Sequence, residues 1–181
     1  MPRINEYDRF PFEIRQRDPN WCIPANVEAV TKYLQPDSLV TQELIWGQFS
    51  KACTIKGWNT REIDFGKIRQ VILEWPAQYS WAYPNHLDPP PDFETYVAQI
   101  KATIVEGFPQ VISVPVNIDG TWRHRHMLTV VEFDDNGFNV HDTGLPSSTS
   151  SPIQLQFDRL RETLNSANTR PLDSLVIRYR P

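Results

Sequence analysis

Cysteine and long apolar runs are scarce in this sequence, and each scarcity excludes a class of protein. Two cysteines, Cys22 and Cys53, are too few for a disulfide scaffold, and their spacing is not that of a metal-ligand pair. No apolar run approaches the ~18 residues of a transmembrane helix, and the first ten residues, MPRINEYDRF, contain no apolar signal region. We therefore expect a soluble, cytoplasmic protein with reduced thiols and no membrane partner. Export as an effector or toxin by a signal-peptide-independent route would leave the same pattern.

Positive charge is also in short supply. Lysine and arginine number 18 against 22 acidic residues, which gives a formal net charge of −4. This balance does not favour nucleic acid as the main partner. The length of 181 residues suits one domain with its own hydrophobic core. We predict a single domain over residues 1–181 without a cofactor or a metal, and the sequence sets no oligomeric state.

The spacing of apolar residues changes midway along the chain. From about 20 to 107 it is mainly helical, and from about 108 to 181 the alternation is typical of strands joined by turns. Helices are predicted at 22–34, 41–49, after Asp64, after Asp92 and at 157–164. Strands are predicted at 109–118, 126–133, 138–142 and 174–180, with turns at Asp119-Gly120 and at 134–137. Helices first and an antiparallel sheet afterwards indicate an α+β fold.

A cysteine stands where the first helix is expected to begin. Unpaired N–H groups and the helix dipole favour an anion in the first turn of a helix, and the thiolate is the nucleophilic form of cysteine. Cys22 is therefore a candidate nucleophile. A lone cysteine on a helix is otherwise a small core residue, which is the interpretation we give to Cys53.

A thiolate needs a base and a group that orients the base. His126 begins an apolar strand, and Asp142 ends the strand that returns beside it. His124 is on the same face of its strand as His126 and is the rival base. A metal site is the alternative chemistry, with the ligand set His124, His126, His141 and Asp142. That alternative leaves the nucleophile candidate without a role.

Two blocks of sequence together resemble the papain-like cysteine peptidases. Gln16 precedes Cys22 with the family's Q-x5-C spacing, and HMLTVVEFDDNGFNVHD (126–142) resembles its block of histidine, strand, turn, strand and Asn/Asp. WCIPANVEAVTKYL (21–34), with an aspartate as the third member, is most similar to the C39-like branch. There are two departures: Ile23 replaces the common glycine, and Asp142 is followed by Thr143-Gly144 instead of proline.

The resemblance implies a papain-like fold, with the nucleophile at a helix start in the helical half and the base in the sheet half. It implies a thiol protease, a hydrolase that cleaves a peptide or isopeptide bond in a peptide or protein substrate through a thioester. It assigns Cys22 as nucleophile, His126 as base, Asp142 as its orienting group and Gln16 as oxyanion donor. Two alternatives stay open: a deamidase or transglutaminase with the same residues, and an inactive C39-like module that binds a peptide.

The register of the hairpin decides whether His126 and Asp142 can meet. A two-residue turn at Asn136-Gly137 would pair Asp142 with Val131, about five residues or ~16 Å from His126 along the strand. The proposed triad therefore requires a loop centred nearer Asp134, or a β-bulge.

Overall fold

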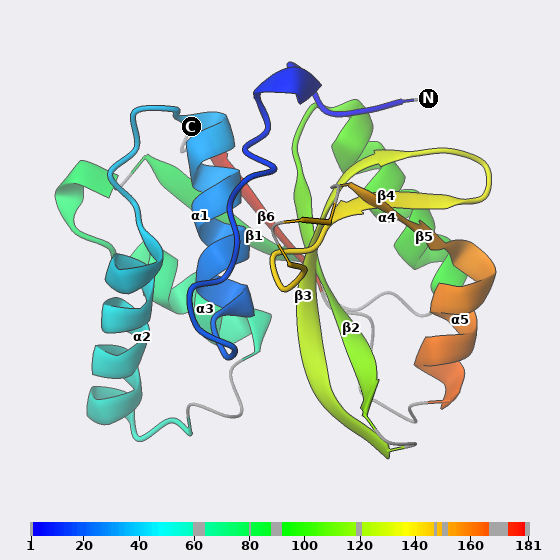
Figure 1. Ribbon diagram of the computed structural model, residues 1–181. Coiled ribbons are helices and arrows are strands. Elements are labelled where there is room, and N and C mark those ends of the chain that lie inside the picture. The colour runs from blue at the N-terminus through cyan, green and yellow to red at the C-terminus, as the bar shows by residue number, and fades with distance from the viewer. Residues whose placement is uncertain are drawn as a thin grey trace.

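Helices cover a central sheet in the computed structural model of the chain (Figure 1). The structure describes residues 2–59, 64–79, 81–87, 92–118, 121–146, 148–149, 152–166 and 174–179. For residues 86–87, 116–118, 121–125 and 166 only the backbone is described. In Figure 1, α1, α2 and α3 lie on one side of the long β2–β3 hairpin, and α5 lies on the other. The turn predicted at Asp119-Gly120 falls outside the described residues.

The order of elements confirms the α+β prediction. The α-helices are α1 (Cys22–Leu34), α2 (Gln42–Lys56), α3 (Phe65–Leu73), α4 (Phe93–Val105) and α5 (Phe157–Ser166). The strands are β1 (Ala82–Leu87), β2 (Gln110–Ile118), β3 (Thr121–Phe133), β4 (Gly137–His141), β5 (Ile153–Gln156) and β6 (Ser174–Tyr179). Short 3-10 turns occur at η1 (Tyr7–Arg9) and η3 (Ala77–Tyr79).

Local capping explains where α3 and α4 begin. The side chains of Asp64 and Asp92 accept hydrogen bonds from the backbone N–H groups of the third residues of α3 and α4, as expected of N-caps. Helix α2 is longer than predicted, because Ala52 and Cys53 continue its buried face beyond residue 49. It ends at Gly57, whose φ of 66° is in the left-handed region that favours glycine.

Within the described residues, six strands form one antiparallel sheet in the order β1-β6-β2-β3-β4-β5. Strands β1 and β5 were not predicted from the sequence. Both are at the edges of the sheet, where a short strand without clean alternation can pair along one side only. Strand β3 begins at Thr121, earlier than the predicted start at 126.

Two apolar clusters fill the spaces on either side of the sheet. Neighbouring residues of one strand point to opposite faces, so Met127 joins one cluster and Leu128 the other. The first cluster contains residues of α1, α2 and α3, and the second contains residues of α4 and α5 together with Ala29 and Tyr33 of α1. The sheet is thereby held between helical layers, and the N-terminal end of α1 lies beside β3.

The β3–β4 hairpin has a shifted loop and also a β-bulge, either of which moves Asp142 toward His126. Phe133 pairs with Phe138, which leaves a four-residue loop that is closed by the Asp134 side chain. The register then shifts at a bulge between Val130 and Glu132. The carbonyl group of Val131, the extra residue, accepts a hydrogen bond from the N–H of Ile4 at 3.0 Å. Beyond the bulge the ladder leads Asp142 to a point about two residues from His126, within reach of a diagonal side-chain contact.

Candidate active site

Cys22 is the first residue of α1. Its N-cap residue, Trp21, makes no side-chain capping bond, so no N-cap side chain accepts a hydrogen bond from the backbone N–H groups of the first turn. The Cys22 side chain is partly buried and carries a free thiol, whereas the second free cysteine, Cys53, is buried on α2. Only the first of the two cysteines is therefore both accessible and at a helix start.

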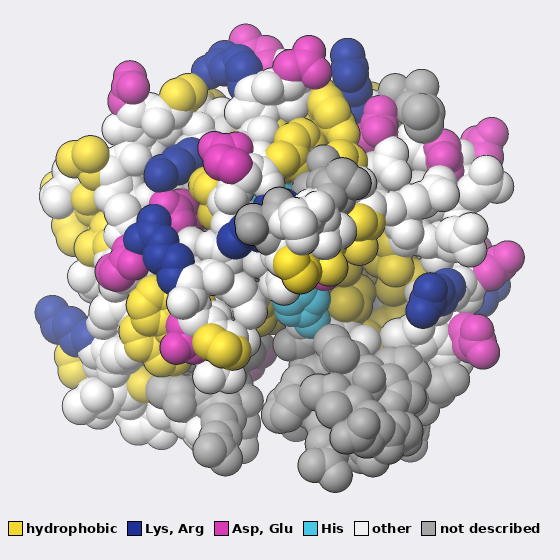
Figure 2. Space-filling view, viewed as in Figure 1, with side chains coloured by type: hydrophobic (Ala, Val, Ile, Leu, Met, Phe, Trp, Pro, Cys, Tyr) yellow, Lys and Arg dark blue, Asp and Glu magenta, His cyan; other side chains and the backbone are white. Residues whose placement is uncertain are grey.

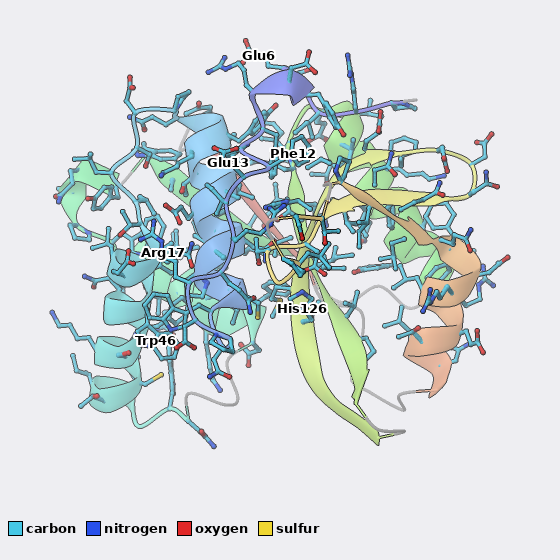
Figure 3. All side chains as sticks on the ribbon, in the orientation of Figure 1. Glu6, Phe12, Glu13, Arg17, Trp46 and His126 are labelled. Atoms are coloured by element: carbon cyan, nitrogen blue, oxygen red, sulfur yellow. The ribbon has the colours of Figure 1, made fainter. Side chains whose placement is uncertain are left out.

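His126 interacts with both the candidate nucleophile and Asp142. Its Nε2 atom is 2.6 Å from Oδ1 of Asp142, and the two side chains are 22% and 15% exposed. The Cys22 side chain is also close enough to hydrogen-bond to the imidazole. A histidine reaches the surface of the face shown in Figure 2, at the place where Figure 3 labels His126. The imidazole can thus be reached by a substrate while both of its neighbours hold it.

The same neighbours set the charge state of the imidazole. Burial acts to lower the pKa of His126, but hydrogen bonds to Asp142 and Cys22 and the charges of both outweigh it and raise the pKa to about 9. Burial acts to raise the pKa of the Asp142 carboxyl, yet the hydrogen bond and charge of His126 hold this pKa below its ordinary value. The imidazolium–carboxylate pair is therefore the stable state at neutral pH.

The Thr143-Gly144 departure from the C39-like pattern has a local structural role. A Cβ atom on Gly144 would lie 3.1 Å from Cε1 of His126 and 3.2 Å from Oδ1 of Asp142. The absence of a side chain lets this loop pack directly on the pair, and the Gly144 N–H donates to Asp142 Oδ1 at 2.8 Å. The carboxylate is thereby held by a backbone donor in addition to the imidazole.

A buried asparagine joins the three segments of the site. Asn26 Nδ2 donates to the carbonyl oxygens of Cys22 at 2.7 Å and Met127 at 2.9 Å, and lies 3.3 Å from Oγ1 of Thr143. Its Oδ1 accepts a hydrogen bond from Thr129 at 2.6 Å. Asn26 was not among the residues predicted from the sequence, although a polar side chain one turn after Cys22, in a stripe of small apolar residues, was the available signal.

Gln16 lies in the loop that leads into α1. Its backbone N–H donates to the Thr143 carbonyl at 2.9 Å, so the segment runs beside the residue that follows Asp142. Its Nε2 donates to the Pro19 carbonyl at 3.1 Å. Its Oε1 is buried and has no hydrogen-bond partner among the described residues. The structure thus places Gln16 beside the Asp142 loop and next to the turn that precedes Cys22.

The remaining candidates lie apart or outside the described side chains. His141 is fully buried against the rings of Phe10 and Phe12, and its Nε2 donates to the Ile14 carbonyl at 3.0 Å. Burial and the charge of Arg15 lower the pKa of His141 to about 4. The side chain of His124 is not among those described. Within the described part of the chain, no group of three or more His, Cys, Asp or Glu residues is arranged to hold a metal ion.

Comparisons with known proteins find likeness in structure and none in sequence. No family model and no curated protein matches the sequence. The peptidase domain of Streptococcus ComA, a bifunctional ABC transporter involved in a quorum-sensing pathway, superposes with a TM-score of 0.57 at 12% identity, over 92% of this chain and 97% of that one. A protein from Bacillus anthracis described as C39-like superposes with a TM-score of 0.61 at 12% identity, over 98% of both chains.

These likenesses bear on the fold alone, because the identities are low. They confirm the resemblance to the C39-like branch at the level of architecture. None of the described helices is long and apolar enough to cross a membrane. The chain has the papain-like α+β fold of C39 peptidase domains.

Proposed function

We propose that this protein is a cytoplasmic, single-domain cysteine hydrolase that cleaves a peptide or isopeptide bond through a thioester intermediate. The observation that carries the proposal is that His126 interacts with both the Cys22 side chain and Asp142, whose Oδ1 is 2.6 Å from the imidazole Nε2. Such an order of nucleophile, base and orienting carboxylate on a papain-like fold supports acyl transfer.

The proposed reaction starts from an ion pair. His126 takes the thiol proton on Nδ1, since Nε2 is occupied by Asp142. The Cys22 thiolate attacks the carbonyl carbon, and a tetrahedral oxyanion forms. When this collapses, the C–N bond breaks and the imidazolium gives its proton to the leaving amine, which leaves a thioester on Cys22. Water, deprotonated by His126, then hydrolyses the thioester and regenerates the thiol. Attack by an amine in place of water would give transamidation instead.

In this proposal the oxyanion is held by the backbone N–H of Cys22 and by the side-chain amide of Gln16. The Gln16 amide nitrogen has two hydrogens. One is donated to the Pro19 carbonyl, which fixes the direction of the group. The second remains for the oxyanion. An amide is neutral, so it stabilises the developing charge without competing for the proton of His126.

Selective alkylation tests whether Cys22 is an activated nucleophile. We expect iodoacetamide to modify Cys22 rapidly at neutral pH and to spare Cys53, because Cys22 is partly exposed and has an imidazolium partner, whereas Cys53 is buried. The measurement is the rate of mass gain at each cysteine, by peptide mass spectrometry after quenching. Cys22 reacting as slowly as free cysteine would identify an inactive C39-like module and overturn the proposal.

Replacing Gln16 by alanine separates oxyanion stabilisation from thiol activation. Loss of one oxyanion donor costs about 10²–10³ in turnover, or roughly 2.7–4 kcal/mol. We expect that loss in the hydrolysis of p-nitrophenyl acetate, with little change in the rate of Cys22 alkylation, since alkylation forms no oxyanion. Gln16→Glu should be at least as damaging, because its carboxylate repels the developing charge. An equal loss of both activities would instead indicate that Gln16 is structural and positions the start of α1.

A further inference from the structure

A buried polar cluster lies behind the loop that contains Gln16. Gln42, the first residue of α2, is 1% exposed, and so is Glu28 in the middle of α1. A buried amide and a buried carboxylate need hydrogen-bond partners. Both find them in the Gln16 loop and in each other.

The amide of Gln42 bonds the backbone on both sides of Gln16. Its Nε2 donates to the carbonyl of Arg15 at 2.9 Å, and its Oε1 accepts from the N–H of Arg17 at 3.0 Å. The Gln42 amide thus donates to and accepts from the loop backbone, as a peptide group of a neighbouring strand would. The N–H of Gln16 itself donates to Thr143. Three consecutive residues are therefore held from two sides, and the Gln16 side chain leaves the backbone in a defined direction.

Gln42 is itself held in place. Its Nε2 also donates to Oε2 of Glu28 at 2.8 Å, and Lys32 balances the charge of Glu28 at 3.0 Å. Glu28 belongs to the helix that begins at Cys22. The hydrogen bonds of Gln42 therefore connect the Gln16 loop to the helix that carries the candidate nucleophile. Arg17, which Figure 3 labels between α1 and α2, forms an ion pair with Glu43 at 2.5 Å. This exposed pair adds a second contact between the Gln16 loop and α2.

We propose that Gln42 is a positioning residue that sets the direction of the Gln16 amide relative to Cys22. The inference rests on the proposed function, in which Gln16 stabilises the oxyanion. An amide is required at this position. A carboxylate would face Glu28 at hydrogen-bond distance with no proton between them, and an apolar side chain would leave the Arg15 carbonyl and the Arg17 N–H unpaired.

A double-mutant cycle tests this inference. Gln42→Met keeps the approximate shape of the side chain and removes the amide. A misplacement of about 1 Å in a catalytic group can cost about 10²-fold, so we expect p-nitrophenyl acetate turnover by Gln42→Met to fall by about that factor. The rate of Cys22 alkylation by iodoacetamide should stay unchanged. In the Gln16→Ala background the same substitution should cost less than about threefold, because residues that act through one another are not additive.

Gln110→Met is the matched control. Gln110 is also fully buried, and its amide donates to Ser174 at 2.8 Å in the sheet, away from the Gln16 loop. We expect it to lower the melting temperature without changing turnover or alkylation. Should Gln42→Met fail to fold, Gln42→Asn serves in its place, since its amide is too short by one methylene to reach both backbone groups.

The outcomes separate the inference from the proposed function. Additive losses in the double variant, or full turnover in Gln42→Met, overturn the inference alone. A parallel loss of alkylation also overturns it, since Gln42 would then act on Cys22. If Gln16→Ala retains full turnover while Cys22 is still alkylated rapidly, the role of Gln16 and this inference fail together, and the nucleophile assignment stands.

Discussion

Replacing His126 by alanine is expected to lower turnover by about 10⁴–10⁶-fold, the range seen when the base of a catalytic triad is removed. In the proposed reaction the imidazole takes the thiol proton of Cys22 and later protonates the leaving amine, and the Cys22 side chain is within hydrogen-bonding reach of it. The loss should extend to alkylation of Cys22, because the thiolate loses its cationic partner. That joint loss distinguishes His126 from Gln16, whose removal affects turnover alone.

His124→Ala is the matched control for this experiment. His124 is the rival base, two residues away on the same strand. The variant is expected to keep both turnover of p-nitrophenyl acetate and rapid alkylation. The base would be reassigned to His124 if the two variants exchanged their effects. Thermal unfolding of each variant shows whether the fold is intact.

Replacing Asp142 by alanine is expected to cut turnover by up to about 10⁴-fold. The carboxylate fixes the imidazole through the 2.6 Å bond to Nε2 and provides the counter-charge of the imidazolium. Asp142→Asn should be milder, because an amide oxygen still accepts the Nε2 proton and keeps the ring oriented. The difference between the two variants measures the contribution of the charge.

The pH dependence of kcat/KM is a second test of the role proposed for Asp142. The pKa of His126 is raised to about 9, so the imidazolium form persists at neutral pH and is lost as the pH rises through about 9. Activity of the wild type should fall along that alkaline limb. In Asp142→Asn the limb should move toward neutral pH, because a main cause of the raised pKa is gone. Asp158→Asn, an exposed substitution on α5, is the control. An unmoved limb in Asp142→Asn would show that another group sets the pKa of His126.

Local sequence signals predicted most of the elements and supplied the candidate site residues. The start of α1 at Cys22 and the caps at Asp64 and Asp92 follow from short stretches of sequence, because capping and apolar periodicity act within a few residues. The two blocks that resemble papain-like peptidases are local in the same sense. Strand β1 was missed, because it exists through pairing with β6, as in Ala82 with Tyr179, far along the chain.

The amino-acid sequence by itself determined the α+β class, the helix that begins at Cys22 and the hairpin that carries the candidate base. Only the tertiary structure decided how that hairpin is aligned. The bulge at Val131 shifts its register, and the N–H of Ile4 from a distant segment satisfies the carbonyl that the bulge leaves outside the ladder. The contacts of Asn26 and Gln42 are likewise made between segments remote in sequence. A register and a buried amide depend on the partners that folding brings within hydrogen-bond distance, and a local pattern cannot specify those partners.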